Sequence, residues 1–63
     1  MIKFIKMVEN AMKIANAGDV NAGIEKLKNA IEAFDKAFES GEIRYDNQSF
    51  RALVDRKIAE LSD

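Results

Sequence analysis

The longest regular pattern of apolar and polar residues lies between Val20 and Ser40. Six apolar side chains follow one another there at steps of four, three, four, three and four residues, a heptad spacing that keeps them on one side of a helix. The six are Val20, Ile24, Leu27, Ile31, Phe34 and Phe38. Gly23, Ala30 and Ala37 stand seven residues apart on one flank of this seam. Because these residues have almost no side chain, we expect a neighbouring backbone to approach closely there.

Two further segments also have a helical pattern. In residues 2–17 the apolar side chains occupy about half of the helix circumference, which is wider than one partner helix covers. From about residue 47 to 62 a narrower apolar stripe follows, made of Phe50, Leu53, Val54, Ile58 and Leu61. We therefore predict three helices, at about 2–17, 20–40 and 47–62. Either both other helices of the chain cover the apolar face of the first, or one does and a second subunit covers the rest.

Glycine and capping residues separate the predicted helices. Gly18 tolerates the left-handed backbone that ends a helix, and Asp19 can accept hydrogen bonds from the free N–H groups that start the next. A connection this short forces the first two helices to be antiparallel neighbours. Gly41 ends the second helix in the same way, and Asp46 or Asn47 caps the third. The predicted fold is all-α, a three-helix bundle built on an antiparallel helical hairpin.

With 63 residues the sequence has room for a single helical domain, residues 1–63, and one small core. A chain of this length buries only about 60% of the surface that its unfolded form exposes, so its stability is marginal without further support. The sequence contains neither Cys nor His. This composition excludes disulfides, thiolate and imidazole catalysis, and nearly every zinc site. Self-association is the support that remains, and we expect a homo-oligomer.

The charge and hydropathy of the chain limit its surroundings. A formal net charge of −1 argues against a nucleic-acid partner, and no segment reaches the roughly 18 apolar residues of a membrane span. The first residues are basic and apolar like an export signal, but Glu9, Asn10 and Lys13 interrupt them, so we interpret them as mature sequence. Lys3, Lys6 and Lys13 share the polar side of the first helix, and we interpret that side as solvated rather than as facing a membrane or phosphates. The cysteine-free composition fits a reducing compartment, and we expect a cytoplasmic protein.

One stretch resembles a known repeat family. The run GDVNAGIEKLKNAIEA, Gly18 to Ala33, resembles the middle of a tetratricopeptide repeat, in which one helix ends in Gly-Asp and the next begins. Ala11, Gly23 and Ala30 stand at small positions of that family, and Leu27 stands at a bulky one. Three positions depart from the family pattern. Val20 stands where an aromatic residue is usual, Asn10 where a Leu is common, and Asp35 where a Pro is frequent. The resemblance covers about half the chain, one repeat at most, and implies a close helical hairpin and a protein-binding role.

The sequence offers little for catalysis. A catalyst would have to use carboxylates, Lys, Tyr or Ser, and no pair of these groups lies on one apolar face. Asp35 and Glu39 are four residues apart, but two carboxylates fall far short of the roughly six or more oxygens of a calcium site. No glycine-rich phosphate loop occurs. We therefore predict no catalytic residue, no metal and no cofactor.

The residues that we expect to bind partners form two groups. The first group lies on the packing faces of the first two helices, where we expect interface contacts: Phe4, Val8, Met12, Gly23, Ala30 and Ala37. The second group lies in the linker and at the start of the third helix, and contains the Arg and Tyr types that are over-represented in interface hot spots. Its members are Arg44, Tyr45, Gln48 and Arg51. In a plainer alternative, Tyr45 packs over the bundle end while Arg44 and Arg51 pair with Glu42, Asp46 or Asp55.

Two functions remain open at this point. The first is a non-enzymatic protein–protein interaction module, an adaptor, inhibitor or assembly factor, that acts through a helical surface. The alternative is a small nucleotide- or anion-binding protein whose pocket forms at a subunit interface around Arg44, Tyr45 and Arg51. Free N–H groups at the start of the third helix favour the binding of an anion there.

Overall fold

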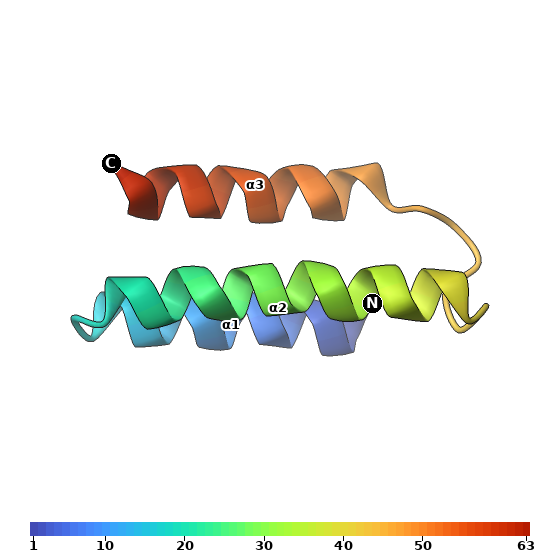
Figure 1. The fold of residues 1–63 in the computed structure, drawn as a ribbon, viewed down its shortest axis with the longest axis horizontal. Helices are drawn as coiled ribbons and strands as arrows, with labels where there is room; N and C mark the ends of the chain where they lie inside the picture. Colours follow the sequence, from blue (N-terminus) through green and yellow to red (C-terminus); the bar gives the residue numbers. More distant parts are fainter.

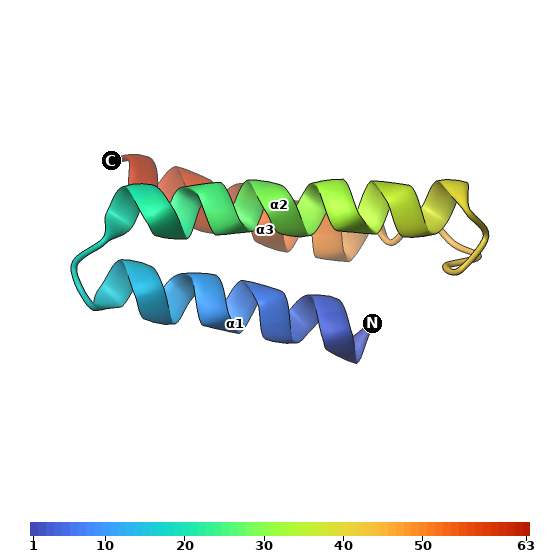
Figure 2. The ribbon, with the colours of Figure 1, turned by 60° about the horizontal axis from the view of Figure 1, so that its bottom comes forward.

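The computed structural model describes all 63 residues and contains three α-helices and no strand. The helices are α1 (Ile2–Asn16), α2 (Val20–Glu39) and α3 (Gln48–Ser62). α2 is central, because α1 packs antiparallel along one of its sides and α3 along another, while α1 and α3 contact each other least (Figures 1 and 2). The bundle is elongated, with extents of 36 × 16 × 15 Å. The predicted all-α bundle on an antiparallel hairpin is confirmed, and each predicted helix end lies within one residue of the observed one.

The connection between α1 and α2 follows from two residues. Gly18 has a φ of 112°, a left-handed conformation that costs glycine little. Its N–H donates to the carbonyl of Ala15, and the N–H of Asp19 donates to that of Ile14, which satisfies two of the last carbonyls of α1. The Asp19 carboxylate then accepts a hydrogen bond of 3.1 Å from the N–H of Ala22. The predicted stop and cap are thus both confirmed.

The connection between α2 and α3 is longer and is tied back to the bundle. Gly41 is left-handed, with a φ of 84°, and the N–H of Ile43 donates to the carbonyl of Ala37 at 3.1 Å. The side chain of Ile43 is half-buried against the core. Of the two predicted caps of α3, Asn47 is the one observed, since its side chain accepts from the N–H of Phe50 at 3.0 Å.

Three phenylalanines, one from each helix, form the largest part of the core. The ring centroids of Phe4 and Phe34 are 5.6 Å apart in an edge-to-face arrangement, and those of Phe34 and Phe50 are 5.0 Å apart. Such pairs contribute about 0.5–1.5 kcal/mol beyond the burial of their area. Leu27 and Val54 continue the core toward the other end of the bundle. Alanines fill most of the remaining buried positions, so the core is thinner there.

The predicted seam of α2 is buried in its middle but not at its ends. Leu27 and Phe34 are fully buried, whereas Val20 is 39% exposed and Phe38 is 40% exposed. The helices α1 and α3 do not cover these end positions. Most of the apolar half of α1 packs inside the chain, but Ile5 stays exposed.

Candidate functional site

The first group of predicted interface residues lies mostly inside the chain. Five of its members are buried and Met12 is half-buried. Gly23 in particular faces α1, because a Cβ atom built on it would lie 2.6 Å from the Cβ of Ala15 and 2.9 Å from the carbonyl oxygen of Ala11. These faces therefore hold α1, α2 and α3 of one chain together. Their use between chains remains a prediction.

The exposed large apolar side chains lie mostly at one end of the bundle. The structure exposes six large hydrophobic side chains, and five of them belong to the start of α1, the end of α2 or the connection to α3. We call these five the loop-end surface: Met1, Ile2, Ile5, Phe38 and Tyr45. Only Val20 lies at the opposite end.

Several contacts bring these segments to the same end. The ammonium of Lys3 lies 3.9 Å from a carboxylate oxygen of Glu42, which joins the start of α1 to the connection after α2. The edge-to-face pair of Phe4 and Phe34 joins the same parts of the two helices. Figure 1 shows the N-terminus lying toward this end of α2. The loop-end surface therefore belongs to one region of the molecule.

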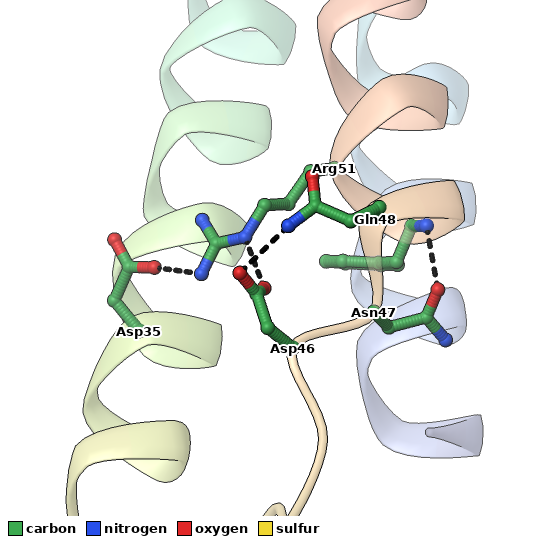
Figure 3. A network of polar contacts seen from close by, with 6 residues as sticks. Asp35, Asp46, Asn47, Gln48 and Arg51 are labelled. Atoms are coloured by element: carbon green, nitrogen blue, oxygen red, sulfur yellow. Dashed lines mark hydrogen bonds and ion pairs between the residues drawn. The ribbon is translucent and has the colours of Figure 1, made fainter.

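Next to this region, Arg51 connects three parts of the chain (Figure 3). Its Nε lies 2.6 Å from Oδ1 of Asp46 in the connection, and its Nη2 lies 2.6 Å from Oδ1 of Asp35 on α2. The guanidinium carbon is also 5.0 Å from the centroid of the Phe34 ring, a cation–π contact. Gln48 donates to the second oxygen of Asp46 at 2.8 Å. Hydrogen bonds with Asp46 and then Asp35 raise the pKa of Arg51, so its positive charge is fixed in place.

The second predicted group is thus divided between two roles. Arg51 and Gln48 belong to the network around Asp46, as the plainer alternative expected for Arg51. Arg44 forms no ion pair. Tyr45 is 81% exposed, so the expectation that it packs over the bundle end is wrong. An anion pocket between subunits remains a prediction, but one of its two expected cations is already paired with two carboxylates.

A groove between α1 and α2 is a feature that the sequence interpretation missed. It has a volume of about 640 Å³ and contains no residue of α3 in its lining. The lining residues are Met7, Asn10, Ala11, Lys13, Ile14, Lys26 and Asn29. The sequence carried no signal for this groove, because its two walls come from different helices whose relative rotation only the fold defines.

Three further features that can mark a functional region are absent from the structure. No three acidic side chains come close enough together to hold a metal ion. No buried side-chain nitrogen or oxygen lacks a hydrogen-bond partner. None of the three helices combines the length and the apolar character needed to cross a membrane.

The fold and these surfaces define a small all-α protein with a three-helix bundle. No family model matches the sequence, and neither a curated protein nor a solved structure matches it. The tetratricopeptide resemblance accordingly remains a prediction that depends on the residues between Gly18 and Ala33 and on Ala11.

Proposed function

We propose that this protein is a small, non-enzymatic protein–protein interaction module, and that its loop-end surface is the part that binds the partner. An adaptor, an inhibitor or an assembly factor all fit this description. The observation that carries the proposal is the concentration of exposed apolar side chains at one end of a chain whose core is small.

Tyr45 is the most exposed residue of the loop-end surface. A tyrosine that is 81% exposed leaves most of an apolar ring in water, at a cost that a partner removes by covering it. Tyr is also among the residues that most often dominate binding energy, because its ring is large and loses little conformational freedom. Phe38 and Ile2, which are 40% and 74% exposed, add apolar area on α2 and α1. Arg44 offers a charged group with no partner of its own in the chain.

The proposal extends to self-association and to the compartment. A second copy of the chain is one partner that the loop-end surface can bind, since a core of this size gains from additional burial. A cytoplasmic setting belongs to the same proposal and is supported by the cysteine-free composition.

Site-specific photo-cross-linking tests the proposal. Tyr45 is replaced by p-benzoylphenylalanine, which conserves an exposed aromatic ring, and the protein is irradiated in a lysate of cells that naturally express it. We expect a discrete adduct that excess unlabelled protein suppresses and that unlabelled Phe38→Ser suppresses less well. Irradiation of the purified protein alone identifies self-cross-links separately.

The control places the same photoreactive residue at Glu25, an exposed position of α2 far from the loop end. The proposal requires that this position give no competed adduct. Identical adducts from both positions, or none from Tyr45 with either a lysate or the protein itself, would rule out the loop-end surface as the binding site.

A further inference from the structure

The groove between α1 and α2 has an apolar floor and a polar rim. Met7, Ala11 and Ile14 form the floor on α1. Lys13 and Asn10 of α1 stand on one wall, and Lys26 and Asn29 of α2 on the other. The methylene stems of the two lysines extend the apolar lining while their ammonium groups remain at the edge.

The four polar side chains of this rim have no partner within the protein. Lys13 and Lys26 belong to none of the ion pairs of the structure, and the side chains of Asn10 and Asn29 form no hydrogen bond. The chain has 11 acidic and 10 basic residues, yet no acidic residue lines the groove. The rim therefore has two positive charges and two free amides without any negative group to balance them.

A solvated lysine by itself indicates nothing, because most surface lysines are unpaired. The groove differs in that two lysines from two helices line one apolar hollow. Two like charges near each other are unfavourable until an anion lies between them. The amides can donate further hydrogen bonds to the oxygens of that anion.

We propose that the groove binds a small anionic amphiphile, a molecule with one carboxylate or phosphate head group and a short apolar body. The head group lies between Lys13 and Lys26, and the apolar body covers Met7, Ala11 and Ile14. The volume of about 640 Å³ falls in the range of roughly 300–1,000 Å³ that is typical of small-molecule sites. From Met7 to Ile14 the floor spans about 10 Å along α1, which suits a short chain rather than a long lipid. This inference goes beyond the proposed protein-binding role and uses a different surface.

A nitrogen-15 NMR titration of the intact protein tests the proposal with four probes that share an eight-carbon chain. Octanoate and octyl phosphate carry the two candidate head groups, octanol is neutral, and octyltrimethylammonium is cationic; all are kept below micelle-forming concentrations. We expect saturable shifts in the amides of residues 7–14 and 26–29, with at least one anionic probe binding about tenfold more tightly than the neutral and cationic probes. Comparison of octanoate with octyl phosphate identifies the preferred head group.

Two double variants with the same change in total charge make the test specific. Lys13→Gln with Lys26→Gln removes both cations of the groove and should weaken anion binding about tenfold, toward the affinity of octanol. Lys28→Gln with Lys36→Gln removes two exposed lysines of α2 outside the groove and should leave the affinity unchanged. All four positions are exposed, so the fold is retained, which circular dichroism checks.

Any one of the following results would overturn the proposal: no saturable shift with either anion, equal binding of all four probes, or equal weakening by both double variants. Shifts centred on the loop-end surface instead of the groove would also overturn it. None of these outcomes affects the cross-linking result at Tyr45, so the two proposals fail separately.

Discussion

Gly23 determines how closely α1 and α2 approach each other. A methyl group at this position would lie 2.6 Å from the Cβ of Ala15 and 2.9 Å from the carbonyl oxygen of Ala11. Both are attached directly to the backbone of α1 and cannot rotate away, so one of the two helices would have to move.

Gly23→Ala has two opposing effects on the stability of the protein. Alanine favours the helix over glycine by about 1 kcal/mol, but overpacking a close contact costs about 1–3 kcal/mol. Because the colliding atoms are rigid, we expect a cost in the upper half of that range, so that the free energy of unfolding falls by about 1–2 kcal/mol. Urea denaturation of the variant and the parent protein measures the difference.

A double-mutant cycle with Ala15→Gly provides the control for this prediction. The second substitution removes the nearer of the two clashing atoms. The double variant should thus be more stable than the sum of the single changes predicts, by at least about 0.5 kcal/mol. Strictly additive effects, or a Gly23→Ala protein as stable as the parent, would show that α1 and α2 are not in close contact at this point.

Single residues whose role depends on near neighbours could be predicted from the sequence. Gly18, Asp19 and Asn47 act within a few residues of themselves, and local rules of backbone conformation and capping identify them. Arg51 has one local partner, Asp46, which was among those expected, and one on another helix, Asp35, which was not. Asp35 is 16 positions away in the sequence, and only the rotation of α2 relative to α3 brings it into reach.

Among the elements, α3 has the smallest share of the core. Only Phe50 and Val54 are buried on it, both in its first half, while Ile58 and Leu61 are half-buried. The ion pairs of Arg51 lie at the same first half and connect α3 with α2 and with the preceding connection. The start of α3 is consequently attached to the bundle more firmly than its end.

Arg51→Ala should loosen this attachment and lower the melting temperature. The matched control is Arg56→Ala on the same helix, since Arg56 is exposed and forms no ion pair. Exposed ion pairs alone contribute little, but Arg51 joins two carboxylates and an aromatic ring at once. We expect the loss from Arg51→Ala to be clearly larger than that from Arg56→Ala and to shrink in high salt.

The pH dependence of this difference has a definite sign. The raised pKa of Arg51 means that the folded protein holds this proton more tightly than the unfolded chain does. The resulting stability is fully present below the ordinary pKa of arginine and is lost only as the pH rises through the higher folded value. The difference between the two variants should therefore be the same at pH 7 and pH 9. Equal melting temperatures for Arg51→Ala and Arg56→Ala would contradict a role for the network in holding α3.

The pattern of apolar residues defined the elements well but not how far each is covered. Heptad and helical periodicity placed all three helices, because that periodicity reports which face of a helix avoids water. The periodicity predicts the same burial for every position of a seam. It therefore does not explain why Leu27 is buried while Val20 and Phe38 remain about 40% exposed. That difference depends on where the partner helices end. The groove between α1 and α2 could not be predicted from the sequence for a related reason. Its lining depends on which sides of the two helices face each other.

For the whole molecule, the accessible surface area can be compared with that of a compact monomer of the same mass. The accessible surface is 4392 Å², whereas a compact monomer of this mass exposes about 4,100 Å². The excess of about 300 Å² is smaller than the roughly 800 Å² that each partner buries in a standard interface. The area alone therefore does not require a second subunit. The argument for association depends instead on which large apolar side chains are exposed, five of which belong to the loop-end surface.

Self-association through this surface is measured by light scattering on a sizing column at two concentrations about a hundredfold apart. Because the surface is apolar but small, we expect a dimer at the higher concentration and a shift toward the monomer at the lower one. Phe38→Ser should give a monomer at both concentrations, whereas Val20→Ser changes an equally exposed apolar residue at the other end and should leave the dimer intact. A parent protein that is monomeric throughout would disprove self-association and leave the loop-end surface free for a different protein. A dimer that Val20→Ser dissociates and Phe38→Ser does not would place the interface at the opposite end, where Val20 is the exposed large apolar residue.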